Sequence, residues 1–247
     1  MKYLVRAVTI IFIVTALISA IYILKNANED KKQSDIFQEL EDIVTEESKD
    51  KNEERKDDNV NLQQLYKVNN DLVGWIKIED TNISYPVMQT ENSRKDYYLR
   101  KNFYKQYSQL GTPYIAEYCN IQTSDNLVIY GHHISNNKMF GELEKYKNEK
   151  FYRNHKIINF DTLYGKSEYK IIAVFKTVAY TGFEYYKFEK ANTEREFDTF
   201  IEKCKELSFY DTEETAEYGD KLITLSTCEY SNKNGRLVVV AKKMTTE

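Results

Sequence analysis

The residues that could do chemistry are a cysteine, an arginine and a histidine at the ends of predicted strands. Cys228 closes the stretch TLSTC at residues 224–228, and Arg236 opens the next apolar stretch after a turn-forming run at 231–235. Two strands joined by so short a turn pair as an antiparallel hairpin, in which opposed residues lie about 5 Å apart. We therefore expect Cys228 and Arg236 to share one site.

An arginine beside a cysteine favours the reactive thiolate, and it can donate hydrogen bonds to an oxyanion once an acyl intermediate forms. The alternative is a surface arginine without a role in chemistry. A cysteine followed eight residues later by an arginine is a weak signal when it stands alone.

The third component is an imidazole. His132 and His133 follow the apolar stretch LVIYG at 127–131, and His155 is the one other histidine. A cysteine nucleophile needs a partner that accepts and returns a proton near neutral pH, which imidazole does. A metal site is the alternative, but adjacent histidines point to opposite faces of an extended chain and no spaced acid or cysteine completes a ligand set. We predict no metal, no calcium cluster and no cofactor.

The elements that must position these residues are mostly strands. Segments rich in Val, Ile, Tyr and Thr predict eight of them, at residues 73–78, 85–89, 113–116, 127–131, 156–161, 168–179, 221–227 and 236–243. The chain is thus expected to be mainly β, as a barrel or a sandwich.

Helices are predicted at residues 60–69, 139–146 and 193–207. In the last, Phe197, Phe200, Ile201, Cys204 and Leu207 form one apolar stripe, so Cys204 is interpreted as a buried core thiol. With Cys119 and Cys228 there are three cysteines, an odd number that leaves at least one thiol free.

The N-terminus carries an apolar run from Ala7 to Leu24, preceded by Lys2 and Arg6. This run is about long enough to cross a bilayer, and the preceding positive charge predicts an N-terminus inside and the remainder outside. A cleaved signal peptide is the alternative. Because the apolar run continues past the small residues Ser19 and Ala20, we expect residues 1–24 to remain as an uncleaved anchor.

Residues 25–59 have a polar, charged composition that buries too little apolar surface to fold alone. Their seven basic and thirteen acidic residues give a net charge of −6, so we predict a solvated stalk, with a short amphipathic helix near 36–44 as an alternative. Residues 60–247 then form the catalytic domain. The chain has no basic patch that indicates nucleic-acid binding.

Taken together, these motifs resemble the signatures of sortases: TLSTC at 224–228, the downstream Arg236 and the strand-end Gly131-His132. The resemblance extends over residues 60–244 through NDLVGWI at 70–76, YPVMQ at 85–89 and MFG at 139–141, and with the helix at 193–207 it is closest to class B. It implies a closed eight-stranded β-barrel with an N-terminal helix and an inserted helix near 193–207.

The resemblance also implies a cysteine transpeptidase on the outer face of the cell membrane. Cys228 would attack the threonine carbonyl of a C-terminal sorting motif in a secreted protein, and His132 would protonate the leaving amine. An amine of a peptidoglycan precursor or cross-bridge would then resolve the thioester, and Arg236 would stabilise the oxyanion at both steps, joined by the backbone N–H of Glu229.

By the same analogy, Leu99, Ser226, Thr227 and Glu229 are assigned to substrate binding. The resemblance does not by itself decide between His132 and His133 as the proton carrier. Three alternatives stay open: a class A sortase with the same triad, a hydrolytic cysteine endopeptidase, and a membrane-tethered surface module that only binds. A pilin-polymerising class C enzyme is disfavoured because no C-terminal apolar span follows Val240.

Overall fold

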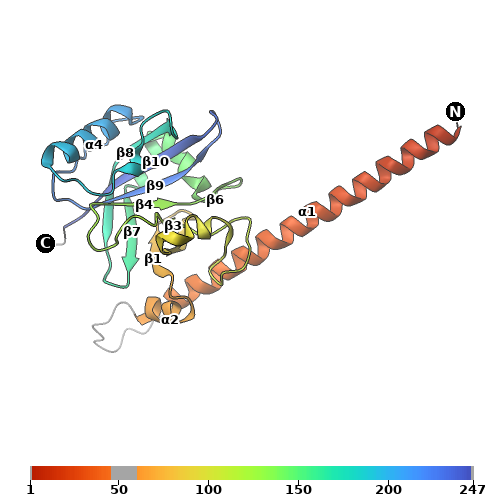
Figure 1. Cartoon of the computed structure of the whole chain (residues 1–247), viewed down its shortest axis with the longest axis horizontal. Coiled ribbons are helices and arrows are strands. Elements are labelled where there is room, and N and C mark those ends of the chain that lie inside the picture. The colour runs from red at the N-terminus through yellow and green to blue at the C-terminus, as the bar shows by residue number, and fades with distance from the viewer. Residues whose placement is uncertain (1, 46–59, 246–247) are drawn as a thin grey trace.

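Eight strands close into a barrel in this computed structural model, which describes residues 2–45 and 60–245. Their order around the barrel is β1-β2-β3-β4-β9-β10-β8-β7, and the short β5 (His133–Ile134) and β6 (Lys138–Met139) pair separately. The barrel strands are β1 (Leu72–Lys77), β2 (Ser84–Met88), β3 (Tyr114–Ile115), β4 (Asn126–Tyr130), β7 (Ile157–Thr162), β8 (Glu168–Val178), β9 (Leu222–Glu229) and β10 (Gly235–Lys243). Each predicted strand is present within two residues of its expected ends, so the eight-stranded barrel is confirmed (Figure 1).

Three adjacent strands bring distant parts of the sequence to one end of the barrel. β4 runs parallel to β9 with Tyr130 opposite Ser226, and the amide of Gly131 extends this pairing by donating to the Ser226 carbonyl at 3.1 Å. β10 runs antiparallel to β9 with Arg236 opposite Cys228. The predicted hairpin is therefore confirmed, and the end of β4 lies beside it.

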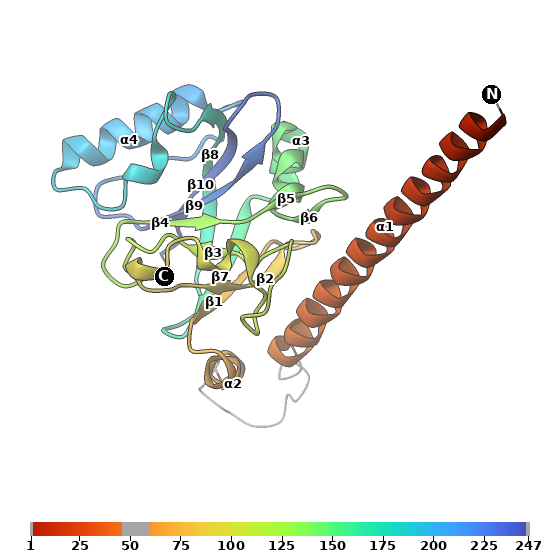
Figure 2. The same ribbon diagram turned by 45° about the vertical axis from the view of Figure 1, so that its right-hand side comes forward.

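The helix α4 (Glu194–Leu207) covers the outside of β8 (Figure 2). Its N-terminus is capped by the Thr193 hydroxyl, which accepts a hydrogen bond from the Glu196 amide at 3.3 Å. Of the predicted apolar stripe, Phe197, Phe200, Ile201 and Cys204 are buried and Leu207 is partly buried, and Cys204 has no exposed surface. Burial raises the pKa of the Cys204 thiol, which confirms its interpretation as a core residue.

The helix predicted at 139–146 is a 3₁₀ helix, η4 (Phe140–Lys147). Phe140, Leu143 and Tyr146 recur every three residues and are all fully buried. A 3₁₀ helix has three residues per turn, so this spacing puts the three side chains on one face, whereas an α-helix would spread them. The helix predicted at 60–69 is present as α2 (Val60–Val68), and a further short helix, α3 (Glu149–Asn154), follows η4.

The N-terminal helix α1 (Lys2–Thr45) is longer than expected and projects from the barrel (Figure 1). Its apolar part is a candidate membrane span with a mean hydropathy of 2.7, and none of that window is buried. Further along, Ile36, Phe37 and Leu40 are buried against the barrel, and the rings of Phe37 and Tyr85 pack edge-to-face with centroids 5.1 Å apart.

Residues 25–45 are thus helical, and burial of the apolar stripe at i, i+1 and i+4 against the barrel departs from the expectation of a fully solvated stalk at residues 36–40. The alternative of an amphipathic helix near 36–44 describes this region better. Residues 46–59, the remainder of the predicted stalk, lie outside the described residues.

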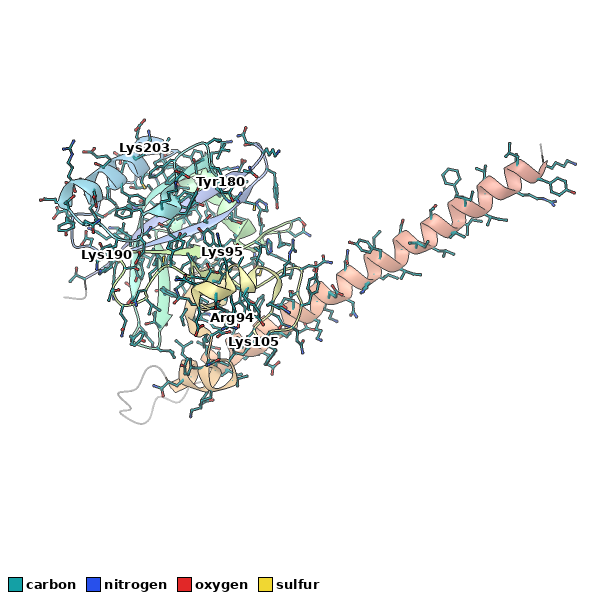
Figure 3. All side chains as sticks on the ribbon, viewed as in Figure 1. Arg94, Lys95, Lys105, Tyr180, Lys190 and Lys203 are labelled. Carbon is teal, nitrogen blue, oxygen red and sulfur yellow. The ribbon has the colours of Figure 1, made fainter. Side chains whose placement is uncertain are left out.

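The connection between β2 and β3 is anchored to a single buried carboxylate. Asp71 pairs with Lys105 at 3.0 Å and with Arg94 at 3.3 Å, and it accepts a hydrogen bond from the Tyr98 hydroxyl at 2.9 Å. The two cationic partners, Arg94 and Lys105, are labelled in Figure 3. Burial opposes ionisation of Asp71, but these partners outweigh it and lower the pKa of the carboxyl. The anchor fixes the short helix η3 (Tyr97–Arg100), and with it the carbonyl of Leu99.

Candidate active site

Cys228 lies near the end of β9, partly exposed, with Arg236 directly across the hairpin. Arg236 donates from Nη1 to the carbonyl of Gly235 at 2.9 Å, which holds one end of the guanidinium. Cys119 and Cys204 are buried, and burial raises the pKa of the Cys119 thiol to about 12. Of the three cysteines, Cys228 is therefore the one that a substrate can reach.

His132 lies just beyond β4, at the same end of the barrel as Cys228. Gly131 before it packs against the Phe140 ring, and a Cβ at this position would approach that ring to 2.5 Å. Only glycine fits so closely, so the turn that presents His132 depends on it.

The His132 ring is oriented by the Leu99 carbonyl, which lies 2.8 Å from Nε2. A carbonyl oxygen can only accept a hydrogen bond, so Nε2 carries the proton and Nδ1 is left with its lone pair. Burial lowers the pKa of His132, partly opposed by the Leu99 contact. The neutral ring is thus a proton acceptor at Nδ1.

His133 has a different environment, as the alternation of an extended chain predicts. Its Nδ1 lies 2.8 Å from the carbonyl oxygen of Cys228 and 3.9 Å from Oε1 of Glu144. The His133 ring contacts the backbone carbonyl of Cys228, whereas the His132 ring contacts the β2–β3 connection. Among the described residues, no group of three or more His, Cys, Asp or Glu side chains is arranged to hold a metal ion.

Tyrosines surround the cysteine–arginine pair, and the sequence analysis did not single them out. The rings of Tyr114 and Tyr130 pack in a tilted arrangement with centroids 5.6 Å apart, and the hydroxyls of Tyr185 and Ser226 are hydrogen-bonded at 2.5 Å. Burial raises the pKa of Tyr185 to about 12, although Ser226 and the charge of Arg236 oppose this. The chain has 21 tyrosines, so composition alone could not indicate which of them gather here.

The residues assigned to substrate binding have differing environments. The Leu99 side chain is 37% exposed, whereas Ser226 and Thr227 are each 2% exposed. Ser226 contacts Tyr185, and the Thr227 hydroxyl has no hydrogen-bond partner within the described part of the chain. Ser226, Thr227 and Glu229 lie on β9 with Cys228. Leu99 lies outside β9, and its backbone carbonyl contacts the His132 ring.

Glu229, the residue after Cys228, is buried in a small ionic cluster. Its carboxylate accepts hydrogen bonds from Lys147 at 3.0 Å and from the Ser231 hydroxyl at 2.6 Å. Burial alone would raise the pKa of Glu229, but Ser231 and Lys147 lower it to about 2. The Glu229 carboxylate is therefore charged, and it accepts hydrogen bonds from groups of the protein itself.

Comparison with known proteins agrees with this geometry. The sortase domain model matches residues 76–244. The chain belongs to the sortase family. Sortase B of Staphylococcus aureus is 34% identical over 184 residues, which cover 73% of either protein. The structure of the present chain superposes on the Staphylococcus aureus sortase B–substrate complex with a TM-score of 0.77 and 31% identity, over 89% of the present chain and 99% of the other.

A structure of sortase B complexed with triglycine likewise gives a TM-score of 0.77 and 31% identity, over 88% of this chain and 100% of that one. The resemblance to class B sortases is thus confirmed, and the chain is a sortase-type cysteine transpeptidase.

Proposed function

We propose that this sortase cleaves the C-terminal sorting motif of secreted proteins after its threonine and transfers the product to a peptidoglycan amine. The observation that carries the proposal is the placement of Cys228 opposite Arg236, with His132 at the end of the neighbouring parallel strand. Membership of the sortase family supports the same reaction class.

In the first step, the Cys228 sulfur attacks the threonine carbonyl carbon. A C–S bond forms, the C–N bond breaks, and the thiol proton passes through His132 to the leaving amine. Nδ1 of His132 is the nitrogen that carries this proton, because Nε2–H is held by the Leu99 carbonyl. Arg236 and the Glu229 N–H donate to the oxyanion.

In the second step, an amine attacks the thioester and the Cys228 sulfur leaves. His132 now accepts the proton of the attacking amine. The sortase B structures with a substrate and with triglycine support a peptide donor and a glycine-type amine acceptor for this chain as well. Leu99, Ser226, Thr227 and Glu229 are assigned to the substrate groove.

The same proposal places the barrel on the outer face of the cell membrane, with the apolar part of α1 as a single span. Lys2 and Arg6 before the span favour an N-terminus inside. The tether keeps the enzyme near exported proteins and membrane-linked wall precursor, which raises their effective concentration.

The test mixes the detergent-solubilised chain with a library of fluorogenic sorting-motif peptides and triglycine, and identifies products by mass spectrometry. We expect cleavage after threonine, an amide product that grows with triglycine, and no turnover by Cys228→Ala. Free acid alone, whatever the triglycine concentration, would instead identify a hydrolytic endopeptidase. No cleavage combined with an unreactive Cys228 would identify a binding module.

A further inference from the structure

A second histidine contacts the backbone of the nucleophile. His133 Nδ1 lies 2.8 Å from the Cys228 carbonyl oxygen, and its ring packs against Tyr230 with centroids 5.0 Å apart. Because a carbonyl can only accept, Nδ1 of His133 carries a proton and donates it to this oxygen. The mechanism above gives His133 no part in proton transfer.

Two charged side chains of η4, Glu144 and Lys147, connect His133 with Glu229, the residue after Cys228. Glu144 lies 3.9 Å from His133 Nδ1 and 2.6 Å from the Lys147 ammonium, which in turn lies 3.0 Å from Glu229. Glu229 also accepts a hydrogen bond from the Ser231 amide at 3.1 Å. The peptide between Cys228 and Glu229 is thus held through its carbonyl by His133, and through the next side chain by Lys147.

The geometry of a peptide bond connects this anchor with catalysis. The carbonyl of Cys228 and the N–H of Glu229 belong to the same planar, trans peptide, so they point in opposite directions. Fixing the carbonyl therefore fixes the direction of the N–H, which the proposed mechanism uses to stabilise the oxyanion. Such a donor works only when it is aimed at the developing charge before the reaction begins.

We propose that His133 is a positioning residue of this sortase, which orients the Cys228–Glu229 peptide for oxyanion stabilisation through its hydrogen bond to the Cys228 carbonyl. The inference rests on the proposed function, because it requires an acyl-transfer reaction at Cys228. The two adjacent histidines then have different roles: His132 transfers the proton, and His133 orients the Cys228–Glu229 peptide.

The experiment compares His133→Ala, His133→Asn and His133→Gln in the full chain. An asparagine amide can place an N–H near the position of Nδ1, whereas a glutamine amide reaches the position of Nε2. We expect Ala and Gln to lower kcat for acylation by about 10- to 100-fold, up to the cost of losing one oxyanion donor, with KM within about threefold of wild type. The His133→Asn variant should recover most of the wild-type kcat for acylation.

A second readout separates positioning from damage to the nucleophile. Alkylation of Cys228 by iodoacetamide passes through no oxyanion, so its rate should stay within about twofold of wild type in all three variants. His155→Ala is the matched control, because His155 Nδ1 makes the same kind of contact, 2.8 Å from the Phe151 carbonyl, on α3. It should leave both rates unchanged.

Three results would overturn the positioning role alone: unchanged kcat in His133→Ala, equal activity of the Asn and Gln variants, or alkylation that falls in step with acylation. Should His133→Ala fail to fold, the comparison of Asn with Gln decides the question. A wild-type chain without any acyl transfer would overturn the proposed function, and the positioning role with it.

Discussion

Replacement of Arg236 by lysine tests the central assignment, because it keeps the charge and changes the geometry. In the structure, Nη1 of Arg236 donates to the Gly235 carbonyl at 2.9 Å, and Arg236 lies opposite Cys228 in the register of the hairpin. A lysine has one ammonium group, which cannot keep the backbone contact and also present a fork of donors to an oxyanion.

The expected loss follows from this count of donors. Removal of one oxyanion donor costs about 10²- to 10³-fold in kcat, or about 3–4 kcal/mol in the barrier. Arg236→Lys should lose a factor in this range in the single-turnover rate of acyl-enzyme formation. It should keep a melting temperature close to that of wild type, because its aliphatic stem fills similar space.

The assay mixes excess enzyme with a sorting-motif peptide and follows the acyl-enzyme by mass spectrometry. Arg153→Lys is the control, since Arg153 is exposed on α3 and pairs with Glu149 away from the site. The control should react like wild type. An Arg236→Lys enzyme that acylates within about fivefold of wild type would refute the assigned role of the guanidinium.

Three further predictions concern stability. Burial lowers the pKa of His132 from its ordinary value of 6.5, so on acidification the unfolded chain takes up a proton at His132 before the native chain does. Lowering the pH from 7.5 to 5.5 should therefore decrease the melting temperature of wild type more than that of His132→Gln. Equal decreases would contradict this. Asp71→Asn should cost about 2 kcal/mol in urea unfolding and slow acylation, because the connection that carries Leu99 loses its anchor; unchanged values for both would count against it. Leu40→Ala should cost about 2–4 kcal/mol because its side chain is 1% exposed, whereas Leu24→Ala, 70% exposed on the same helix, should leave the urea midpoint of the detergent-solubilised chain unchanged; equal effects would refute docking of α1.

Local patterns were sufficient for the strands and for the hairpin that pairs Cys228 with Arg236. The apolar runs have clear turn residues between them, and the hairpin depends only on neighbouring segments. Pairing of β4 with β9 joins segments about a hundred residues apart, and nothing in either segment specifies the other. The proximity of His132 to Cys228 was therefore expected only through the family resemblance.

Contacts that depend on three-dimensional packing could not be predicted. The stripe of Ile36, Phe37 and Leu40 is short and lies among charged residues, so its burial depends on a partner surface that the sequence does not reveal. Tyr114 and Tyr130 are likewise brought together by the register of β3 and β4, and Tyr185 joins them from the 3₁₀ helix at Tyr185–Lys187 through its contact with Ser226. The contact of His133 with the Cys228 backbone needs both β5 and β9 in place.

The continuity of α1 also determines how the enzyme searches for substrate. Ile36, the first apolar residue of the docked stripe, lies twelve positions after Leu24, at the end of the apolar run. As a helix this spacer rises about 18 Å, whereas a flexible linker would let the barrel wander over a comparable radius in every direction. In the proposed membrane crossing, the spacer is a rigid helical connection between the membrane and the barrel. Cys228 then stays in a thin layer at a fixed height above the membrane, and under the proposed function its encounters with exported chains become a two-dimensional search in the plane of the membrane.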